Sequence, residues 1–487
     1  MLELESPSNK RAARKRNPRD PTPRFRPTRH TQLDAVDGCP ELQVPGEHLA
    51  RGVWSIVEQL DTTSLEKNYS ALGRRGYHPK RILAVWVYAS LIGLHHSTKL
   101  ARACVTDAAL RWLCGGDRPS GPTLRRARMN NADLFALAIE RTIALAAEMN
   151  LVDIDDLAVD SVRIRAHASL AAVRTVTRST KRLAALSDVD TAALSNEGRV
   201  AYEASVKKHR DALEECQRRD VPNIVVTNEL ASLMKLPSGA SAPAHRATVV
   251  SSGASSRFVV GVIIDGSSSD SGKLEESMTS VRDTLDRLGL RDRPLVVAAD
   301  AGFCKDIDLQ FAMANKPWVD ALIASRDVEK SNSGLFGRDR FVIDEQQRAT
   351  CPVGTQMLGP YPNDKTGNAW KWVGVGCSNC SLKSQCTKGQ TRSLNVDFSK
   401  DRARHSMEER MSRPGAKERY DRRIATVEPV FSFMQDAMAF RRCSSRLTAT
   451  VKAEVLLKIL AYNIDRLLRA IRTNERIRLV YVVVDEF

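Results

Sequence analysis

Apolar residues recur at three- and four-residue spacing through residues 79–94, 97–113 and 133–149. This spacing places them on one face of an α-helix and therefore predicts three amphipathic helices. The Gly115-Gly116 pair, followed by two nearby prolines, breaks the pattern after the second helix. The pattern predicts a small helical domain over residues 49–150. Such a domain is either a DNA-binding unit that presents one helix to a groove or a packing and dimerisation bundle.

The pattern changes at residue 151, where short apolar runs typical of β-strands begin. Strands are predicted at residues 157–166, 223–227, 247–252, 258–265, 294–300 and 319–325. Charged, alanine-rich helical sequence interrupts them over residues 170–218, and a further helix is predicted at residues 273–288. Strands that alternate with helices and irregular insertions indicate one α/β domain, whose first part covers residues 151–329.

Residues 330–400 form a second interruption, rich in Gly, Asn, Ser and Cys. Residues 401–475 are helical again, with apolar periodicity near the end, and are predicted to complete the α/β domain. Residues 476–487 form a short C-terminal tail. We find no internal repeat in the chain.

The sign of the charge narrows the range of partners. The 487 residues include 74 Lys+Arg and 58 Asp+Glu, a net charge of +16. Such an excess favours a polyanion, because each cation that meets a phosphate releases a condensed counterion. An enzyme with a merely basic surface is the alternative. Residues 1–48 read as a disordered basic arm, or as a solvated leader with no role, and their cations include Lys10, Arg11, Arg14, Lys15 and Arg16.

The chain shows no sign of a membrane or secreted protein. Its N-terminus is charged and lacks the apolar core of a secretory signal. The longest apolar run, residues 82–94, is well short of the ~20 residues that span a bilayer. Ten cysteines in a chain of this length are no secreted disulfide framework. We therefore expect an intracellular, soluble protein.

Two aspartates follow apolar strand-like runs, Asp160 and Asp300. The C-terminal ends of strands face the ligand crevice of α/β sheets, so these positions favour catalysis, although turns and helix caps also recruit Asp. Glu428 lies in helical sequence directly before Pro429. A proline inside a helix removes a backbone hydrogen bond, and such departures from regular structure often occur at functional sites. The alternative is a helix that begins at Pro429.

Together these segments resemble the DDE transposases of bacterial insertion sequences. The motifs that carry the resemblance are Ala158-Val-Asp-Ser-Val-Arg-Ile-Arg, Val297-Ala-Ala-Asp-Ala-Gly-Phe, Tyr420-Asp-Arg-Arg and Val427-Glu-Pro-Val-Phe, with Gly76-Tyr-His-Pro-Lys and Arg111-Trp-Leu-Cys-Gly-Gly in the helical region. Each motif alone is modest, but their order and separation are specific, and they extend over most of the chain.

The resemblance implies an RNase H-like fold, a mixed sheet flanked by helices. It implies that Asp160, Asp300 and Glu428 hold two Mg²⁺ or Mn²⁺ ions, with Asp160 shared between them. It further implies metal-dependent cleavage of double-stranded DNA, transfer of a 3′-hydroxyl end to target DNA, and a homodimer that holds two element ends. A cytoplasmic protein associated with the nucleoid is expected.

Residues near Glu428 are candidates for contacts with DNA. Arg422 and Arg423 match basic positions of the family, whereas Gln435 stands where the family commonly has Lys or Arg. In an α-helix Gln435 shares the face of Glu428, and Arg423 lies about 140° away from it. We therefore interpret Arg423 as a contact to backbone phosphate, or as part of a solvated face, rather than as part of the metal site. The family's Asp-rich stretch appears here as Thr227-Asn-Glu-Leu.

Four cysteines in the second interruption have the types and spacing of a possible zinc site. Cys351, Cys377, Cys380 and Cys386 include one Cys-x2-Cys step, and four thiolates suit one tetrahedral structural Zn²⁺. Their flanking residues resemble a cysteine-bearing insertion in one branch of the transposase family. Unligated structural thiols are the alternative.

Three functions remain open at this point: an active transposase, a catalytically decayed DNA-binding relative that acts as a repressor, and an RNase H-like nuclease. The intact carboxylates favour the first over the second. The basic arm and the helical N-terminal region favour the first over the third, because a simple nuclease does not need them for recognition of DNA ends.

We predict that deletion of residues 1–30 weakens DNA binding about equally for all sequences and flattens its dependence on salt. The arm's cations would contact phosphates rather than bases, and each lost contact lowers the number of counterions released. Binding isotherms at several salt concentrations test this, and an unchanged salt slope would show that the arm takes no part.

Overall fold

The computed structural model describes residues 24–33, 38–67, 69, 75–314, 317–324, 335–363 and 369–473. The predicted arm cations at positions 10–16 and the predicted tail lie outside these residues. The chain divides into two compact units, residues 1–138 and 139–487. Among the described helices, none combines the length and the apolar character that crossing a membrane requires.

The first unit is helical. Its helices are α1(Pro40–Gln43), α2(Leu49–Glu58), α3(Thr63–Glu66), α4(Pro79–Leu91), α5(Ser97–Thr106), α6(Ala108–Leu113) and α7(Gly121–Asn130), and α8(Ala132–Glu148) continues into the second unit. The core forms around the almost fully buried α4, where Trp86 donates a hydrogen bond to the carbonyl of Leu124 on α7 at 3.1 Å.

The prediction of one helix over residues 97–113 is wrong at a single residue. Asp107 has an extended backbone, and its side chain accepts a hydrogen bond from the Leu110 N–H at 2.9 Å. This is an N-cap, which ends α5 and starts α6. The apolar spacing continues across the break, so periodicity alone did not reveal it.

The second unit is built on one mixed sheet. Its strands are β1(Leu157–Arg165), β4(Ser232–Lys235), β5(Ser241–Ser252), β6(Phe258–Asp265), β7(Leu295–Ala299) and β8(Val319–Ile323). The main order is β6–β5–β1–β7–β8, and β4 pairs with the first residues of β5. The pairs β6–β5 and β5–β1 are antiparallel, whereas β1–β7 and β7–β8 are parallel. This confirms the predicted RNase H-like fold.

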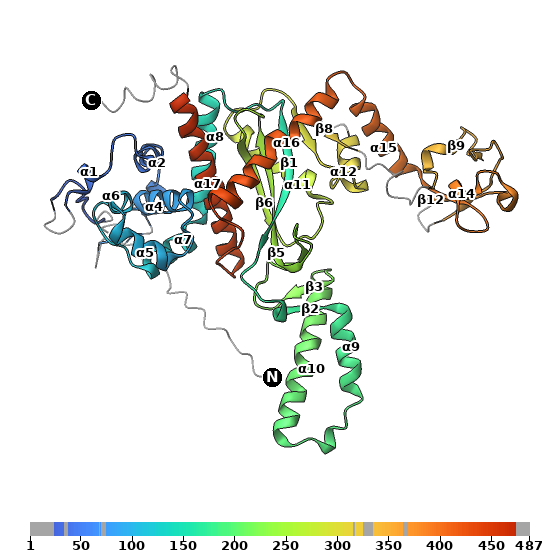
Figure 1. The fold of residues 1–487 in the computed structure, drawn as a ribbon, viewed down its shortest axis with the longest axis horizontal. Helices are drawn as coiled ribbons and strands as arrows, with labels where there is room; N and C mark the ends of the chain where they lie inside the picture. The colour runs from blue at the N-terminus through green and yellow to red at the C-terminus, as the bar shows by residue number, and fades with distance from the viewer. Residues whose placement is uncertain are drawn as a thin grey trace. The chain divides into compact units, whose positions relative to one another are not determined.

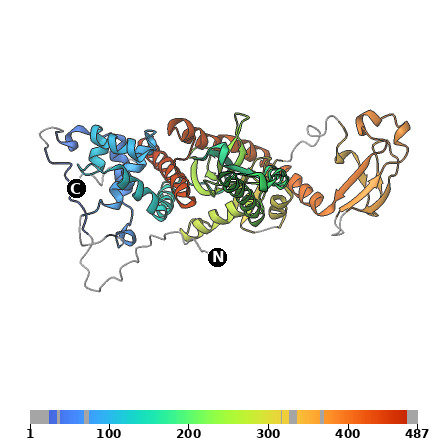
Figure 2. The same ribbon diagram turned by 90° about the horizontal axis from the view of Figure 1, so that it is seen from below.

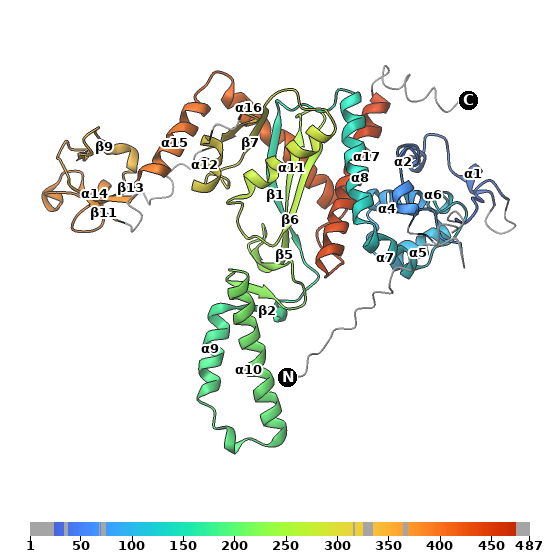
Figure 3. The same cartoon turned by 180° about the vertical axis from the view of Figure 1, so that it is seen from behind.

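Helices cover both faces of this sheet. They are α11(Lys273–Arg287), α12(Asp306–Met313), α15(Phe398–Met411), α16(Ala416–Ser432) and α17(Thr448–Thr473), and α16 runs on into the π-helix η5(Phe433–Ala437). Helix α16 packs on β1, β5 and β7 at the front of Figure 1, and α11 packs on β5 and β6 at the front of Figure 3. The site described below therefore lies on the α16 side of β1.

The helical segment predicted after β1 is a helix hairpin. Its elements are η1(Leu170–Ala172), β2(Val173–Thr175), α9(Val176–Ser187), η2(Thr191–Ala193), α10(Asn196–Arg218) and β3(Asn223–Val225). Helices α9 and α10 lie side by side, as Figures 1 and 3 show, and the antiparallel pair β2–β3 closes the base of the hairpin.

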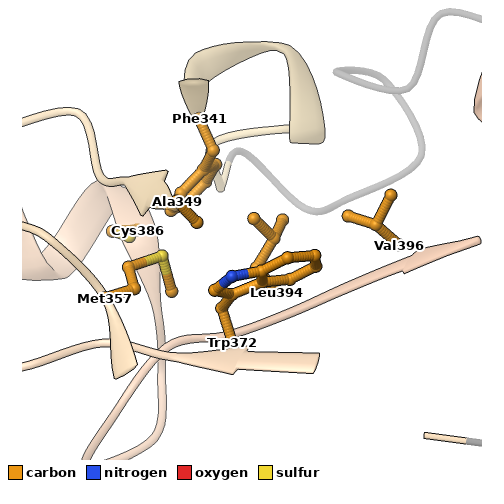
Figure 4. Packing of buried hydrophobic residues seen from close by; sticks show 7 residues of the cluster. All are labelled: Phe341, Ala349, Met357, Trp372, Cys386, Leu394 and Val396. Carbon is orange, nitrogen blue, oxygen red and sulfur yellow. The ribbon is translucent and has the colours of Figure 1, made fainter. Parts of the chain in front are cut away.

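The cysteine-containing segment has a hydrophobic core of its own. Its elements are η3(Arg338–Arg340), β9(Val342–Ile343), β10(Ala349–Thr350), β11(Leu358–Pro362), β12(Ala369–Val373), η4(Cys377–Asn379), α14(Lys383–Cys386) and β13(Ser393–Asp397). Strands β11, β12 and β13 form a small antiparallel sheet, drawn in orange in Figure 2. Trp372 is fully buried at the centre of the core, which also contains Met357 and Cys386 (Figure 4).

The side chain of Asn463, on α17, forms hydrogen bonds with backbone groups at the edge of the sheet. Its side-chain amide accepts from the Val259 N–H at 3.1 Å and donates to the Val259 carbonyl at 2.9 Å, and it also donates to Thr142 of α8 at 3.2 Å. Val259 lies on β6, whose other side pairs with β5. The buried amide of Asn463 thus replaces the strand that β6 lacks.

We predict that Asn463→Ala lowers the free energy of unfolding by about 2 kcal/mol, because it leaves both buried backbone groups of Val259 unpaired. Chemical denaturation measures this change. The same substitution at exposed Asn196 serves as the control and should have almost no effect. An Asn463→Ala protein as stable as wild type would contradict the role assigned to this amide.

Candidate active site

The register of β1 and β7 places Asp160 beside Asp300. The parallel pairing joins Leu157 to Val297 and continues to Val159 and Ala299, and the two aspartates are the next residue of each strand. Neighbouring strands lie about 4.8 Å apart, so the two side chains are neighbours. Two adjacent strands of one sheet therefore bring together the two aspartates that the sequence analysis singled out separately.

The sequence analysis expected Asp160 at the C-terminal end of its strand. In the structure it lies within the strand. Strand β1 continues to Arg165, because β5 pairs with it along its whole length and places Val249 opposite Asp160. Only the pairing with β7 stops before Asp160. The aspartate is therefore fixed by a strand on one side and open to a ligand on the other.

The carboxyl of Asp160 lacks sufficient positive charge around it. Burial raises its pKa, and the negative charge of Asp300 raises it further. The Ser161 N–H, which donates to Asp160 Oδ1 at 2.7 Å, and the guanidinium of Arg423 act in the opposite direction but do not compensate. Two aspartates held this way create a site that an additional cation would stabilise.

Arg423 belongs to this site, which corrects our interpretation from the sequence. Its Nη1 lies 3.2 Å from Asp160 Oδ2, and its side chain is only 10% exposed. The sequence analysis took the face of α16 that carries Glu428 as the face of the site. In the structure, the face that packs on the sheet is the one that carries Arg423. Arg422 is exposed and pairs more loosely with Asp156, at 3.5 Å.

Glu428 lies on the exposed side of α16. The helix passes through Pro429 without a break, so the alternative in which a helix begins there is wrong. The buried face of α16 near this point consists of Thr426, Val427 and Val430. No hydrogen bond or ion pair within the described part of the chain joins Glu428 to either aspartate, and its role remains a prediction from the resemblance.

Gln435 lies in the π-helix that follows α16, half-buried, with its backbone carbonyl accepting from Arg441 at 3.2 Å. A π-helix contains more residues per turn than an α-helix. The α-helical spacing that placed Gln435 on the face of Glu428 therefore does not extend to this residue.

The sequence analysis missed a buried polar network beside the two aspartates. Arg246 of β5 is fully buried, and its Nη1 contacts Asp270 Oδ1 and donates to Ser161 Oγ at 2.8 Å. The hydroxyl of Ser161 donates to the same oxygen of Asp270. The one signal in the sequence is that Arg246 directly precedes the predicted strand at residues 247–252, and a guanidinium buried in a sheet requires a carboxylate partner.

A cavity at the far end of β1 is lined by basic residues. It has a volume of about 660 Å³, and Arg165, His167, Arg442 and Arg446 line it together with serine and threonine side chains. Its lining residues include no Asp or Glu. Such a cavity is suited to the phosphates of a nucleic-acid strand.

The first unit contains a second basic cavity, of about 760 Å³, in which Arg26, Arg75, Arg118 and Arg126 are accompanied by Tyr69, Tyr77 and two asparagines. Arginines provide contacts to phosphate, and tyrosine and asparagine can contact sugar and bases. This cavity favours the DNA-binding interpretation of the helical unit over the packing interpretation.

The four cysteines line one cavity of about 390 Å³. Two of them begin tight turns, since the Gly354 N–H donates to the Cys351 carbonyl at 2.8 Å and the Cys380 N–H donates to the Cys377 carbonyl at 3.4 Å. Burial raises the pKa of Cys386; Arg392 lowers it, while the other three cysteines raise it. Together with the shared cavity, this places the other three thiols near Cys386.

No three His, Cys, Asp or Glu side chains of the described residues stand close enough to hold a metal ion as they are arranged here. Both groups nevertheless fit a metal by chemistry. The aspartates offer hard oxygen donors of the type that Mg²⁺ requires. For the cysteines, a Cβ on Gly374 would stand 2.6 Å from Cys377 Sγ. Only a glycine at position 374 therefore leaves room for this thiol.

Comparison with known protein families gives two matches. Residues 350–468 match the model of a transposase DDE domain, and residues 39–130 match the model of a transposase domain known as DUF772. The first match contains Glu428 and the four cysteines, and the second covers most of the helical unit. Neither the curated proteins nor the solved structures gave a match.

Proposed function

We propose that this chain, which belongs to the DDE-type transposases, cleaves DNA strands at the ends of an insertion sequence and transfers the resulting 3′-hydroxyl to target DNA. The observation that carries the proposal is the pair Asp160 and Asp300 on adjacent parallel strands of an RNase H-like sheet. Their like charges are brought together at a place that favours a bound cation.

Asp160 and Asp300 would hold the divalent cations, Mg²⁺ or Mn²⁺, with Glu428 as the third carboxylate on the strength of the resemblance. The cations, when bound, supply activation of the attacking hydroxyl and stabilisation of the leaving oxygen. Arg423 partly offsets the charge of Asp160 in the absence of a cation. It is placed to pair with a phosphate of the bound strand once Asp160 binds metal.

The basic cavities support double-stranded DNA as the partner. Strand β1 carries Asp160 at its middle and Arg165 at the end beside the cationic cavity, five residues further on. At about 3.3 Å per residue this separation is about 16 Å, the length of a few nucleotides. A DNA strand whose scissile phosphate lies at the aspartates would place neighbouring phosphates near Arg442 and Arg446. A homodimer that holds two ends follows from the resemblance.

We predict that Asp160→Asn, Asp300→Asn and Glu428→Gln each lower Mg²⁺-dependent cleavage of element ends by at least about a thousandfold and leave DNA affinity within about threefold. The chemistry needs the cations, whereas affinity comes mainly from Lys and Arg contacts to phosphate. Gel assays of cleavage and binding on one DNA substrate measure both quantities.

A reciprocal control uses Arg442→Ala combined with Arg446→Ala, which should weaken DNA binding and leave Mn²⁺ binding unchanged. A variant that keeps near-normal cleavage would remove its residue from the site. Wild-type protein that binds the ends without cutting them would favour the repressor. Wild-type protein that cuts without joining would favour the nuclease.

We also propose that Cys351, Cys377, Cys380 and Cys386 bind one structural Zn²⁺. The four thiols line a single cavity, and the small core around Trp372 has few apolar residues, so a metal would contribute to its stability. The ion would stand apart in function from the catalytic cations, because four thiolates leave no open coordination position.

Protein purified without chelator should contain about one zinc per chain, measured by elemental analysis. Cys377→Ser and Cys380→Ser should lose the zinc and lower the melting temperature, while the Mg²⁺ requirement of cleavage stays unchanged. Cys39→Ser, at a half-buried cysteine outside the cavity, is the matched control and should retain the metal. Zinc-free wild-type protein would leave the four residues as unligated thiols.

A further inference from the structure

We propose that Asp270, in the loop between β6 and α11, is a further aspartate of the catalytic metal site and binds a divalent cation together with Asp300. This inference rests on the proposed function, since it assigns an additional ligand to the same site. Asp270 lies outside both matched regions.

Two side chains fix one oxygen of Asp270. Its Oδ1 contacts the Nη1 of the fully buried Arg246 and accepts from the hydroxyl of Ser161. Ser161 directly follows Asp160, and its backbone N–H holds the carboxylate of that residue. One residue of β1 thus orients both Asp160 and Asp270, which ties the position of the loop to the strand that carries the catalytic aspartate.

The second oxygen of Asp270 lies toward Asp300. A Cβ on Gly302 would stand 2.7 Å from Asp300 Oδ1 and 3.1 Å from Asp270 Oδ2, so both oxygens lie beside one point at the surface of Gly302. The Gly302 N–H donates to the same oxygen of Asp300 at 2.7 Å. Any side chain larger than that of glycine would occupy the space between the two carboxylates.

The geometry differs from that of a simple counter-ion to Arg246. A carboxylate that only neutralises an arginine favours a two-pronged pair with the guanidinium. Here Arg246 uses Nη1 on one oxygen of Asp270 and Nε on the carbonyl of Ser267, and its buried Nη2 has no hydrogen-bond partner in the described structure. Oδ2 of Asp270 is therefore directed to the acidic side of the site.

The loop itself is held rigidly. Asp308 of α12 is buried and accepts from the Gly272 N–H at 2.8 Å and from the Leu274 N–H at 3.1 Å. These bonds fix the first turn of α11, whose N-cap Gly272 lies two residues after Asp270. A ligand on such a loop needs little ordering when a cation binds, which is what a preorganised site requires.

Titration of the full-length protein with Mn²⁺, in the absence of DNA and followed by calorimetry and by the electron spin resonance of free Mn²⁺, tests the assignment. Asp270→Asn should weaken Mn²⁺ binding at least about tenfold or remove one ion. The matched control is Asp265→Asn, which removes a carboxylate near Arg246 that pairs instead with Lys273 and should bind Mn²⁺ as wild type does.

A cysteine in place of the aspartate gives a second readout. Asp270→Cys should bind Cd²⁺ more tightly than wild type does, because a thiolate is a soft ligand, and DNA cleavage should be recovered with Mn²⁺ or Cd²⁺ but not with Mg²⁺. Gly302→Ala should weaken Mn²⁺ binding as well, through displacement of the carboxylates. Circular dichroism confirms that each variant is folded.

The proposal is overturned if folded Asp270→Asn binds Mn²⁺ like wild type while Asp160→Asn and Asp300→Asn lose it, since Asp270 would then serve only Arg246. It is also overturned if Asp270→Asn fails to fold and Asp270→Cys folds without any gain in Cd²⁺ affinity. Should Asp160→Asn and Asp300→Asn also bind Mn²⁺ normally, the proposed function itself fails.

Discussion

The parallel register between β1 and β7 is the constraint from which the chemistry of this protein follows. Val159 and Ala299 are fully buried and paired, so Asp160 and Asp300 must be neighbours at the point where that pairing stops. Two carboxylates that close repel each other, and burial of Asp160 makes its charge more costly. Arg423, the Ser161 N–H and the network of Arg246 reduce that cost without removing it, which leaves the site in need of a cation.

The sequence predicted the strands and helices well wherever the pattern was local. The apolar run that ends before Asp300 predicted β7, and the segments predicted at 258–265 and 273–288 match β6 and α11 within one residue. The pattern failed where a single side chain overrode it. Asp107 capped α6 inside a continuous apolar spacing, and β5 begins six residues earlier than predicted, in a stretch with few large apolar residues.

The site was predictable only in part, for the same reason. Asp160 and Asp300 each follow an apolar run, a signal that lies within a few residues of each. Asp270 has no such signal, because its partners Arg246 and Ser161 come from other strands, and Ser161 is 109 residues away in the chain. Arg423 was misassigned because a helical wheel gives angles between residues but does not say which face packs on the sheet. That information comes from tertiary contacts alone.

The aspartates of the proposed active site contrast with the positive charge of the chain as a whole. The chain carries a net charge of +16, yet the point at which DNA is proposed to react has several aspartates around it. A phosphate that approaches Asp160, Asp270 and Asp300 is repelled unless cations lie between them, and in a partly buried site this repulsion is only weakly screened. The same cations that would drive the reaction are therefore needed to admit the scissile phosphate. Flanking phosphates, by contrast, meet arginines such as Arg442 directly. DNA affinity and DNA cleavage thus depend on different residues, and only cleavage should require the divalent metal.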